Sequence, residues 1–304
     1  MEYVVQTNNL TKRFGKETAV TSLNMKIPKG EIYGFLGPNG SGKTTTIRML
    51  LGLMKPTNGT VTIFQKELKK ERIHILRKVG ALVENPSYYA HLTAYENLEA
   101  LRKILDAPKQ RINEVLDIVR LSDVAHKKVK GFSLGMKQRL GIAASLLHQP
   151  ELLILDEPTN GLDPSGIIEI RQLIKHLASA HGMTILISSH LLAEIDQLAT
   201  TVGIVAKGKM IFQDSIDVMR KLAKSHILLK VSNGQHACRT LLENGIQAEY
   251  NNDSLLVAEH ANEKVAEAVS ILVHHNFSVY RVEEEKRSLE EIFLHMTNEE
   301  KAYV

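Results

Sequence analysis

A glycine-rich segment between residues 37 and 44 constrains this chain more than any other part of its sequence. It fits the pattern G-x-x-x-x-G-K-[ST] and reads Gly37-Pro38-Asn39-Gly40-Ser41-Gly42-Lys43-Thr44. The apolar run Ile32 to Leu36 before it is typical of a buried strand, and the residues from Thr44 to Leu51 favour a helix. A glycine-rich turn can be purely structural, but every position and both flanks match. We therefore predict a loop that binds the phosphates of a nucleoside triphosphate.

The chemistry of phosphate binding explains these residue types. Glycines permit a tight turn in which backbone N–H groups point inward at the phosphates. The N-terminus of the following helix adds a partial positive charge. Lys43 is expected to reach the β- and γ-phosphates, and the Thr44 hydroxyl is expected to ligate Mg²⁺. The loop alone leaves GTPases, kinases, helicases and transport ATPases open.

Two acidic residues end a second apolar run, Leu152 to Leu155. Asp156 can hold the water shell of Mg²⁺ beside Thr44, and Glu157 can polarise a water molecule for attack on the γ-phosphate. Two acids at a buried strand end are uncommon without a cation, so we favour this role over an ordinary strand end. His190 follows the next apolar strand and is a candidate γ-phosphate contact.

Composition is that of a globular chain. The 304 residues are 43% hydrophobic, enough for a large domain with a small one. No stretch approaches the roughly 20 apolar residues of a membrane-spanning helix, and the first residues lack the pattern of a secretion signal. The single cysteine, Cys238, excludes an internal disulfide and a cysteine-built metal site. We expect a cytoplasmic protein.

Charge divides the chain in two. Residues 1–224 carry 31 Lys+Arg against 21 Asp+Glu, a net +10, whereas residues 225–304 carry 7 against 13, a net −6. The change of sign supports a boundary near residue 220. We expect a first domain over residues 1–222, with a helical subdomain at about 85–148, and a second over 223–304. A basic first domain suits nucleotide, nucleic acid or an anionic membrane face without choosing among them.

The order of predicted elements favours an α/β first domain. Its continuous apolar runs suit parallel strands that helices bury on both faces. A helix from about Pro164 to Ala180 joins two of these strands into a strand-helix-strand unit. Past Ala223 the pattern indicates a small α+β module of split βαβ type. That module carries no cluster suited to catalysis, so we expect a regulatory, interaction or simply stabilising role.

The segment Phe132–Leu140, FSLGMKQRL, completes a set of motifs. Ser133 is a good helix N-cap, and a capped helix N-terminus is also an anion site. With this segment in place, nearly all of residues 3–220 resembles the nucleotide-binding subunit of an ABC transporter in the order of its motifs. The resemblance implies a P-loop NTPase of ABC type with a helical subdomain, plus the small C-terminal α+β domain.

The resemblance also implies a role for each motif. Gly37–Thr45 is similar to the Walker A loop and Leu152–Asp156 to the Walker B strand, which makes Glu157 the catalytic base and His190 the switch histidine. In the signature motif, the family brings the equivalents of Ser133 and Gly135 against ATP held by a second copy. The remaining residues implied to lie at the nucleotide are Thr45, Asp163 of the D-loop, and Phe14, which would stack on adenine unless it is simply packed.

Two positions depart from the family pattern. The usual signature is Leu-Ser-Gly-Gly-Gln, whereas Phe132–Met136 reads Phe-Ser-Leu-Gly-Met. Glu84 stands where the family typically has the Q-loop glutamine. A carboxylate can ligate Mg²⁺ and accept from water, but it cannot donate as an amide does. The resemblance thus implies a catalytic and metal-binding role for Glu84, with a polar strand end as the alternative.

The entry to the loop, the phrase Phe132–Ala143 and Glu84 resemble a narrower group, the ATPases of exporters for bacitracin-type and lantibiotic peptides. This implies an ATP-hydrolysing motor that dimerises around two Mg-ATP and drives a separate membrane permease from the inner face of the cell membrane. Antibiotic resistance or self-immunity would be its role, and no nucleic-acid partner is expected. The alternatives are a soluble ABC ATPase acting on ribosomes or DNA, and the ATPase of an exporter for another small molecule or ion. An import ATPase is disfavoured because the C-terminal module lacks the short alternating strands of a small barrel.

Overall fold

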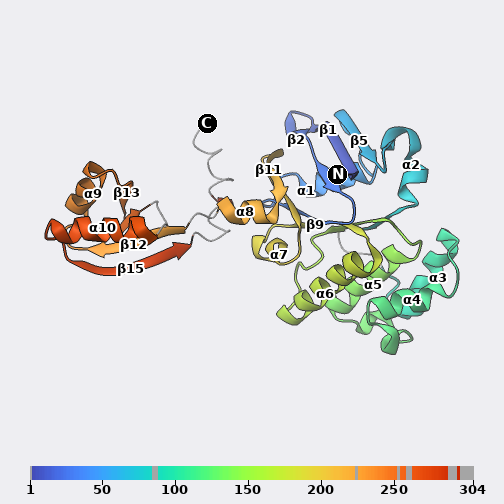
Figure 1. Ribbon diagram of the computed structural model, residues 1–304. Helices are drawn as coiled ribbons and strands as arrows, with labels where there is room; N and C mark the ends of the chain where they lie inside the picture. The colour runs from blue at the N-terminus through green and yellow to red at the C-terminus, as the bar shows by residue number, and fades with distance from the viewer. Residues whose placement is uncertain are drawn as a thin grey trace. The chain divides into compact units, whose positions relative to one another are not determined.

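The structure is a computed structural model that describes residues 2–83, 88–222, 225–251, 254–257, 262–286 and 293–294. The chain separates into two units, Met1–Ile216 and Asp217–Val304. Figure 1 shows the first unit with its antiparallel strands β1, β2 and β5 grouped at one end and helices α3 to α6 at the other. None of the described helices is both long and apolar enough to cross a membrane.

The three predicted buried strands lie side by side in the central sheet of the first unit, whose order is β11-β10-β4-β9-β8-β7. Neighbours are parallel except β10 and β11, which are antiparallel. Every residue of β4, β8 and β9 is buried, which explains why these strands are continuous apolar runs. The strands are β4 (Ile32–Leu36), β7 (Val79–Leu82), β8 (Leu152–Asp156), β9 (Thr184–Ser189), β10 (Thr201–Ala206) and β11 (Lys209–Ser215).

A second, antiparallel sheet contains β1 (Tyr3–Phe14), β2 (Glu17–Leu23), β3 (Lys26–Pro28), β5 (Asn58–Ile63) and β6 (Lys66–Glu67). Helix α1 (Lys43–Leu50) links the two sheets through one hydrophobic core. Its buried Ile47, Met49 and Leu50 belong to the same cluster as Leu10 of β1 and Phe35 of β4. The phosphate loop therefore lies between the buried strand β4 and helix α1, and α1 packs against both sheets of the first unit.

Helices form the rest of the first unit. Helix α3 (Ala94–Leu105) begins with a capping box between Thr93 and Glu96. The others are α2 (Leu68–Leu76), α4 (Arg111–Ile118), α5 (Leu134–Leu146), α6 (Pro164–His181), α7 (Leu192–Asp196) and the 3₁₀ turns η1 (Ser122–Val124) and η2 (Val129–Gly131). Helix α8 (Ile216–Leu222) begins at the last residue of the first unit and continues into the second.

The second unit has the split βαβ topology that its sequence predicts. Its elements are β12 (Ser225–Val231), α9 (Gly234–Glu243), β13 (Ala248–Asn251), β14 (Ser254–Val257), α10 (Asn262–His274) and β15 (Val279–Lys286), with sheet order β13-β14-β12-β15. It has a hydrophobic core of its own, around Leu229, Leu241, Leu255 and Leu272. Beyond β15 the structure describes only Phe293 and Leu294, and both are helical.

Candidate functional site

The phosphate loop needs glycine at two positions for steric reasons. Gly42 precedes α1 with φ +101°, and a Cβ there would lie 2.6 Å from the carbonyl oxygen of Ala19. A Cβ on Gly37 would lie 2.3 Å from the carbonyl oxygen of Val205. Both approaches are far closer than a real Cβ allows. The loop is thus held against β2 and β10 in a shape that other residue types cannot adopt.

Lys43 points into this loop from the first turn of α1. Its side chain is only 5% exposed, and its ammonium group donates to the carbonyl oxygens of Gly37 at 2.7 Å and Pro38 at 3.3 Å. The buried hydroxyl of Ser41 has no hydrogen-bond partner among the described residues, although a donor of this kind suits a phosphate oxygen. Thr44 and Thr45 follow, half-buried, while Pro38, Asn39 and Gly40 are exposed. The loop therefore fits a bound phosphate chain.

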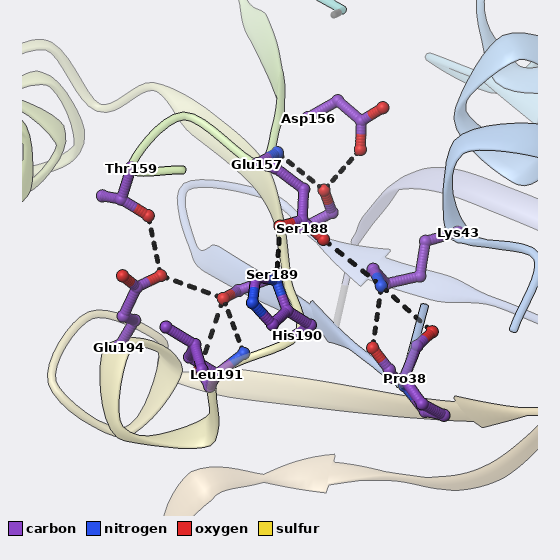
Figure 2. Close-up of polar contacts among 11 residues, drawn as sticks. Pro38, Lys43, Asp156, Glu157, Thr159, Ser188, Ser189, His190, Leu191 and Glu194 are labelled. Atoms are coloured by element: carbon purple, nitrogen blue, oxygen red, sulfur yellow. Dashed lines mark hydrogen bonds and ion pairs between the residues drawn. The ribbon is translucent and has the colours of Figure 1, made fainter. Parts of the chain in front are cut away.

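Asp156 and Glu157 are fixed together by Ser188, a residue to which the sequence analysis assigned no role. In the parallel register of β8 and β9, Asp156 pairs with Ser188. The buried Ser188 hydroxyl donates to Oδ1 of Asp156 at 2.6 Å and accepts from the backbone N–H of Glu157 at 2.9 Å (Figure 2). Ser188 lies beside the two acids only because of the register between β8 and β9. In the sequence, the one sign of its role is that polar residues follow the run 184–187.

Glu157 leaves the strand in a left-handed conformation, with φ +49°. For a residue other than glycine this costs about 1–2 kcal/mol. The turn directs its carboxylate toward two other predicted site residues, Lys43 and His190, as Figure 2 shows. Oε1 lies 3.3 Å from the Lys43 ammonium, and Oε2 lies 2.6 Å from Nδ1 of His190. Because a carboxylate accepts, Nδ1 is the donating nitrogen, and Nε2 stays available for another group.

The other predicted residues lie outside this cluster. Phe14 ends β1 with 48% of its surface exposed, and the Lys12 ammonium lies 5.2 Å from its ring centroid. Asp163 caps α6 by accepting from the backbone N–H of Gly166 at 3.0 Å. Ser133 caps α5, as predicted, by accepting from the N–H of Met136 at 3.2 Å. Glu84 lies outside the described residues.

The residue that follows residues 84–87 contacts α5. Tyr88 donates its hydroxyl to the backbone oxygen of Lys137 at 2.6 Å, and burial raises the pKa of this phenol well above its ordinary value. Tyr88 is thereby attached to the helix whose N-cap is Ser133. No motif in the sequence pointed to this contact.

Known sequences similar to this chain include transport ATP-binding proteins, and a known family also matches it. The family described as "ABC transporter" matches residues 20–160. The bacitracin transport ATP-binding protein BcrA of Bacillus licheniformis is 45% identical over 299 residues, covering 97% of this chain and 97% of that protein. The lantibiotic transport ATP-binding protein SrtF of Streptococcus pyogenes is 44% identical over 214 residues, covering 70% of this chain and 92% of that protein.

Solved structures that superpose on this chain include ATP-binding subunits and cassettes as well. The ATP-binding subunit of an ABC transporter superposes with a TM-score of 0.64 at 27% identity, covering 72% of this chain and 92% of that one. A dimeric ATP-binding cassette in a post-hydrolysis state, bound to ADP and Pi, superposes with a TM-score of 0.62 at 28% identity, covering 70% and 98%. Each likeness extends over most of the known protein.

Proposed function

This chain belongs to the family of ABC transporter ATP-binding subunits, which are ATPases, and we propose that it powers export of peptide antibiotics through a separate membrane permease. The cluster of Lys43, Glu157 and His190 at the phosphate loop carries the catalytic part of this proposal. The cargo class rests on the relatives, one named for bacitracin transport and one for lantibiotic transport. The bacitracin relative matches along 97% of this chain, second unit included.

The cluster supports a division of roles in hydrolysis. Glu157 accepts the proton of the attacking water, and His190 orients the Glu157 carboxylate through Nδ1 while offering Nε2 to the γ-phosphate. Lys43, which neutralises Glu157 in this arrangement, would pair instead with the β- and γ-phosphates of ATP. Glu157 and the phosphates of ATP thus compete for the Lys43 ammonium group. Binding of ATP therefore frees the Glu157 carboxylate from Lys43 so that it can act as the base.

The residues around the loop also fit a magnesium ion. The Thr44 hydroxyl and the Asp156 carboxylate, which Ser188 orients, would hold it, with Glu84 as a further candidate ligand. When bound, Mg²⁺ neutralises charge on the phosphates during hydrolysis. Phe14, with half of its surface exposed, is proposed to stack on the adenine.

A second copy of the chain completes the site in this proposal. Gly135 lies in the first turn of α5, where an added Cβ would meet only the side chain of Leu162, at 3.9 Å. Nothing within the described part of one chain therefore requires glycine there. Glycine does allow an external group to approach the backbone closely, and a nucleotide held by a partner copy is such a group. Asp163 and Ser133, both exposed, would face the same interface.

The test uses a variant arrested before hydrolysis. Replacing the base in Glu157→Gln should lower ATP turnover by about 10²- to 10⁴-fold while nucleotide binding persists. The purified variant, offered to detergent-solubilised host membranes with Mg-ATP, should retain a polytopic membrane protein in equal amount. Lys43→Ala, which should not hold ATP, is the matched control. Recovery of ribosomes or DNA-bound proteins instead would contradict the export role while leaving the ATPase assignment intact.

The cargo needs its own measurement. Co-expression of the chain with the recovered permease should raise the concentration of a bacitracin-type or lantibiotic peptide needed to stop bacterial growth. The same pair carrying Glu157→Gln should give no protection. Unchanged sensitivity to these peptides in the active pair would overturn the peptide class alone.

A further inference from the structure

We propose that Glu194, a buried carboxylate in α7, is a positioning residue that holds the catalytic pair Glu157 and His190 in place. This inference rests on the roles proposed for those two residues. No motif of the sequence assigned Glu194 any function. Its carboxylate is nevertheless the point at which two separate segments of the site are tied together.

The contacts around Glu194 are short and buried. Oε2 of Glu194 accepts from the Thr159 hydroxyl at 2.7 Å and from the Ser189 hydroxyl at 2.9 Å (Figure 2). Exposure is 7% for Glu194, 5% for Thr159 and 2% for Ser189. A carboxylate removed from water is stable only when hydrogen-bonded, so these two hydroxyls are required for its burial.

The two donors lie next to the catalytic pair along the chain. Thr159 comes two residues after Glu157, and Ser189 immediately precedes His190. Glu157 and His190 meet directly, at 2.6 Å. Backbone and hydrogen bonds therefore form a closed ring from Glu157 through Thr159, Glu194, Ser189 and His190 back to Glu157. Glu194 fixes the buried side of this ring, and the catalytic contact forms its more exposed side.

Ser189 also holds the turn that carries His190. Its hydroxyl oxygen accepts from the backbone N–H of Leu191 at 3.0 Å. The single hydroxyl proton points to Glu194 at 2.9 Å rather than to the more distant oxygen of Leu191 at 3.3 Å. Ser189 is thus anchored to the Glu194 carboxylate, and Leu191, on the other side of His190, is held by Ser189.

Simple packing does not account for a charged residue at this position. Its neighbours in α7, Leu192 and Ile195, are buried apolar side chains, and well-packed apolar residues are often as stabilising as buried charges. A carboxylate adds direction, because it accepts two hydrogen bonds at defined angles. Directional anchoring matters at a catalytic pair, where a misplacement of about 1 Å can lower the rate about 100-fold.

The experiment compares two substitutions of similar size. Glu194→Gln keeps an oxygen that can accept from both hydroxyls, so its kcat for ATP hydrolysis should stay within about threefold of the wild type. Glu194→Leu removes the acceptor, and kcat should fall about 10- to 100-fold while KM for ATP changes little. Ile195→Val, which trims a buried neighbour in α7 but leaves the hydroxyls alone, should keep kcat. Thermal unfolding of each variant controls for folding.

A double-mutant cycle identifies the route of the effect. Thr159→Val should lower kcat in the wild type but cause no further loss in Glu194→Leu, because both remove one interaction. If Glu194→Leu does not fold, Thr159→Val combined with Ser189→Ala should reproduce the loss of kcat. Wild-type kcat in these variants, or equal losses in Glu194→Gln and Glu194→Leu, would overturn the positioning role. Full turnover in Glu157→Gln would instead overturn the proposed base, so the two failures are distinguishable.

Discussion

Single residues in this protein serve several contacts at once. The Ser188 hydroxyl donates to Asp156 and accepts from the N–H of Glu157, so one oxygen atom orients both acids of the site. Glu157 adopts a conformation that costs about 1–2 kcal/mol, and this hydrogen bond helps to stabilise it. The cost is tolerated because the turn aims the carboxylate at Lys43 and His190.

His148 gives a prediction at the same scale. It follows α5, where Nε2 contacts the carbonyl oxygen of Val79 at 3.1 Å and must donate to it. The buried Nδ1 has no partner among the described residues, so a proton there would be unsatisfied. Burial accordingly lowers the pKa of His148 below its ordinary value, with the Val79 hydrogen bond opposing the shift.

The consequence is a stability that decreases in mild acid. The unfolded chain takes up a proton near pH 6.5, whereas folded His148 does so only at lower pH. The contribution of His148 is therefore complete above about pH 6.5 and is lost as the pH falls from there toward the folded pKa. His148→Gln, which can still donate to Val79, should show a smaller decrease in urea-unfolding free energy between pH 7 and pH 5. Parallel pH profiles for the two proteins would contradict this assignment.

At the scale of secondary-structure elements, pairs of neighbouring strands hold the residues of the site together. Parallel strands β8 and β9 place their carboxyl ends side by side, and this brings Asp156 next to Ser188 and Glu157 next to His190. Helix α5 has Ser133 as its N-cap and Gly135 in its first turn. Tyr88 contacts the same helix through the backbone oxygen of Lys137.

Gly135 allows a test of that second copy. Alanine in a helix is favoured over glycine by up to about 1 kcal/mol, and a Cβ at residue 135 meets no closer neighbour than 3.9 Å in one chain. Gly135→Ala should therefore melt at the wild-type temperature or higher. Its ATP turnover should still fall steeply, because the added methyl group would block the approach of a partner's nucleotide.

The matched control for this variant is Gly131→Ala. A Cβ on Gly131, in η2, would have none of the described residues within 4 Å. Gly131→Ala should keep both turnover and ATP-dependent dimerisation, the latter measured by size exclusion in the Glu157→Gln background. Normal turnover in Gly135→Ala would show that no group outside the chain approaches this backbone.

At the scale of the whole molecule, the described residues of each unit contain a hydrophobic core that lies within that unit. One joins both sheets of the first unit through α1, and the other lies between the sheet and helices of the second. Charge follows the same division, with +10 on residues 1–224 and −6 on residues 225–304. Independent cores predict that the units unfold in separate steps.

Leu229 tests this expectation. It is fully buried in the second core, so Leu229→Ala should destabilise the second unit by about 2–5 kcal/mol. Calorimetry should show one transition moved to lower temperature and the other unchanged, with ATP hydrolysis by the first unit retained. Leu228→Ala, at a half-buried neighbouring position, should have a smaller effect. A single transition that shifts as a whole would contradict independent cores.

The sequence by itself determined the phosphate loop, the buried parallel strands, the N-cap of α5 and the alternation of elements in the second unit. These depend on local chemistry, since glycine spacing, apolar periodicity and N-cap residues act over a few positions. Strand β1, by contrast, was not predicted. Its polar middle, with Asn9 at φ +46°, lacks a clean alternation. The strand is held by pairing with β2 and β3, which follow it in the chain, and with the more distant β5.

Only the tertiary structure decided how the site is held. Ser188, Thr159 and Glu194 are ordinary polar residues in the sequence, and their roles depend on the register of β8 with β9 and on the burial of α7. The direct contact between Glu157 and His190, 33 positions apart, likewise depends on that register. Motifs identify groups that must touch a ligand because chemistry limits the residue type. The groups that orient them can be any donor or acceptor that the fold brings within reach.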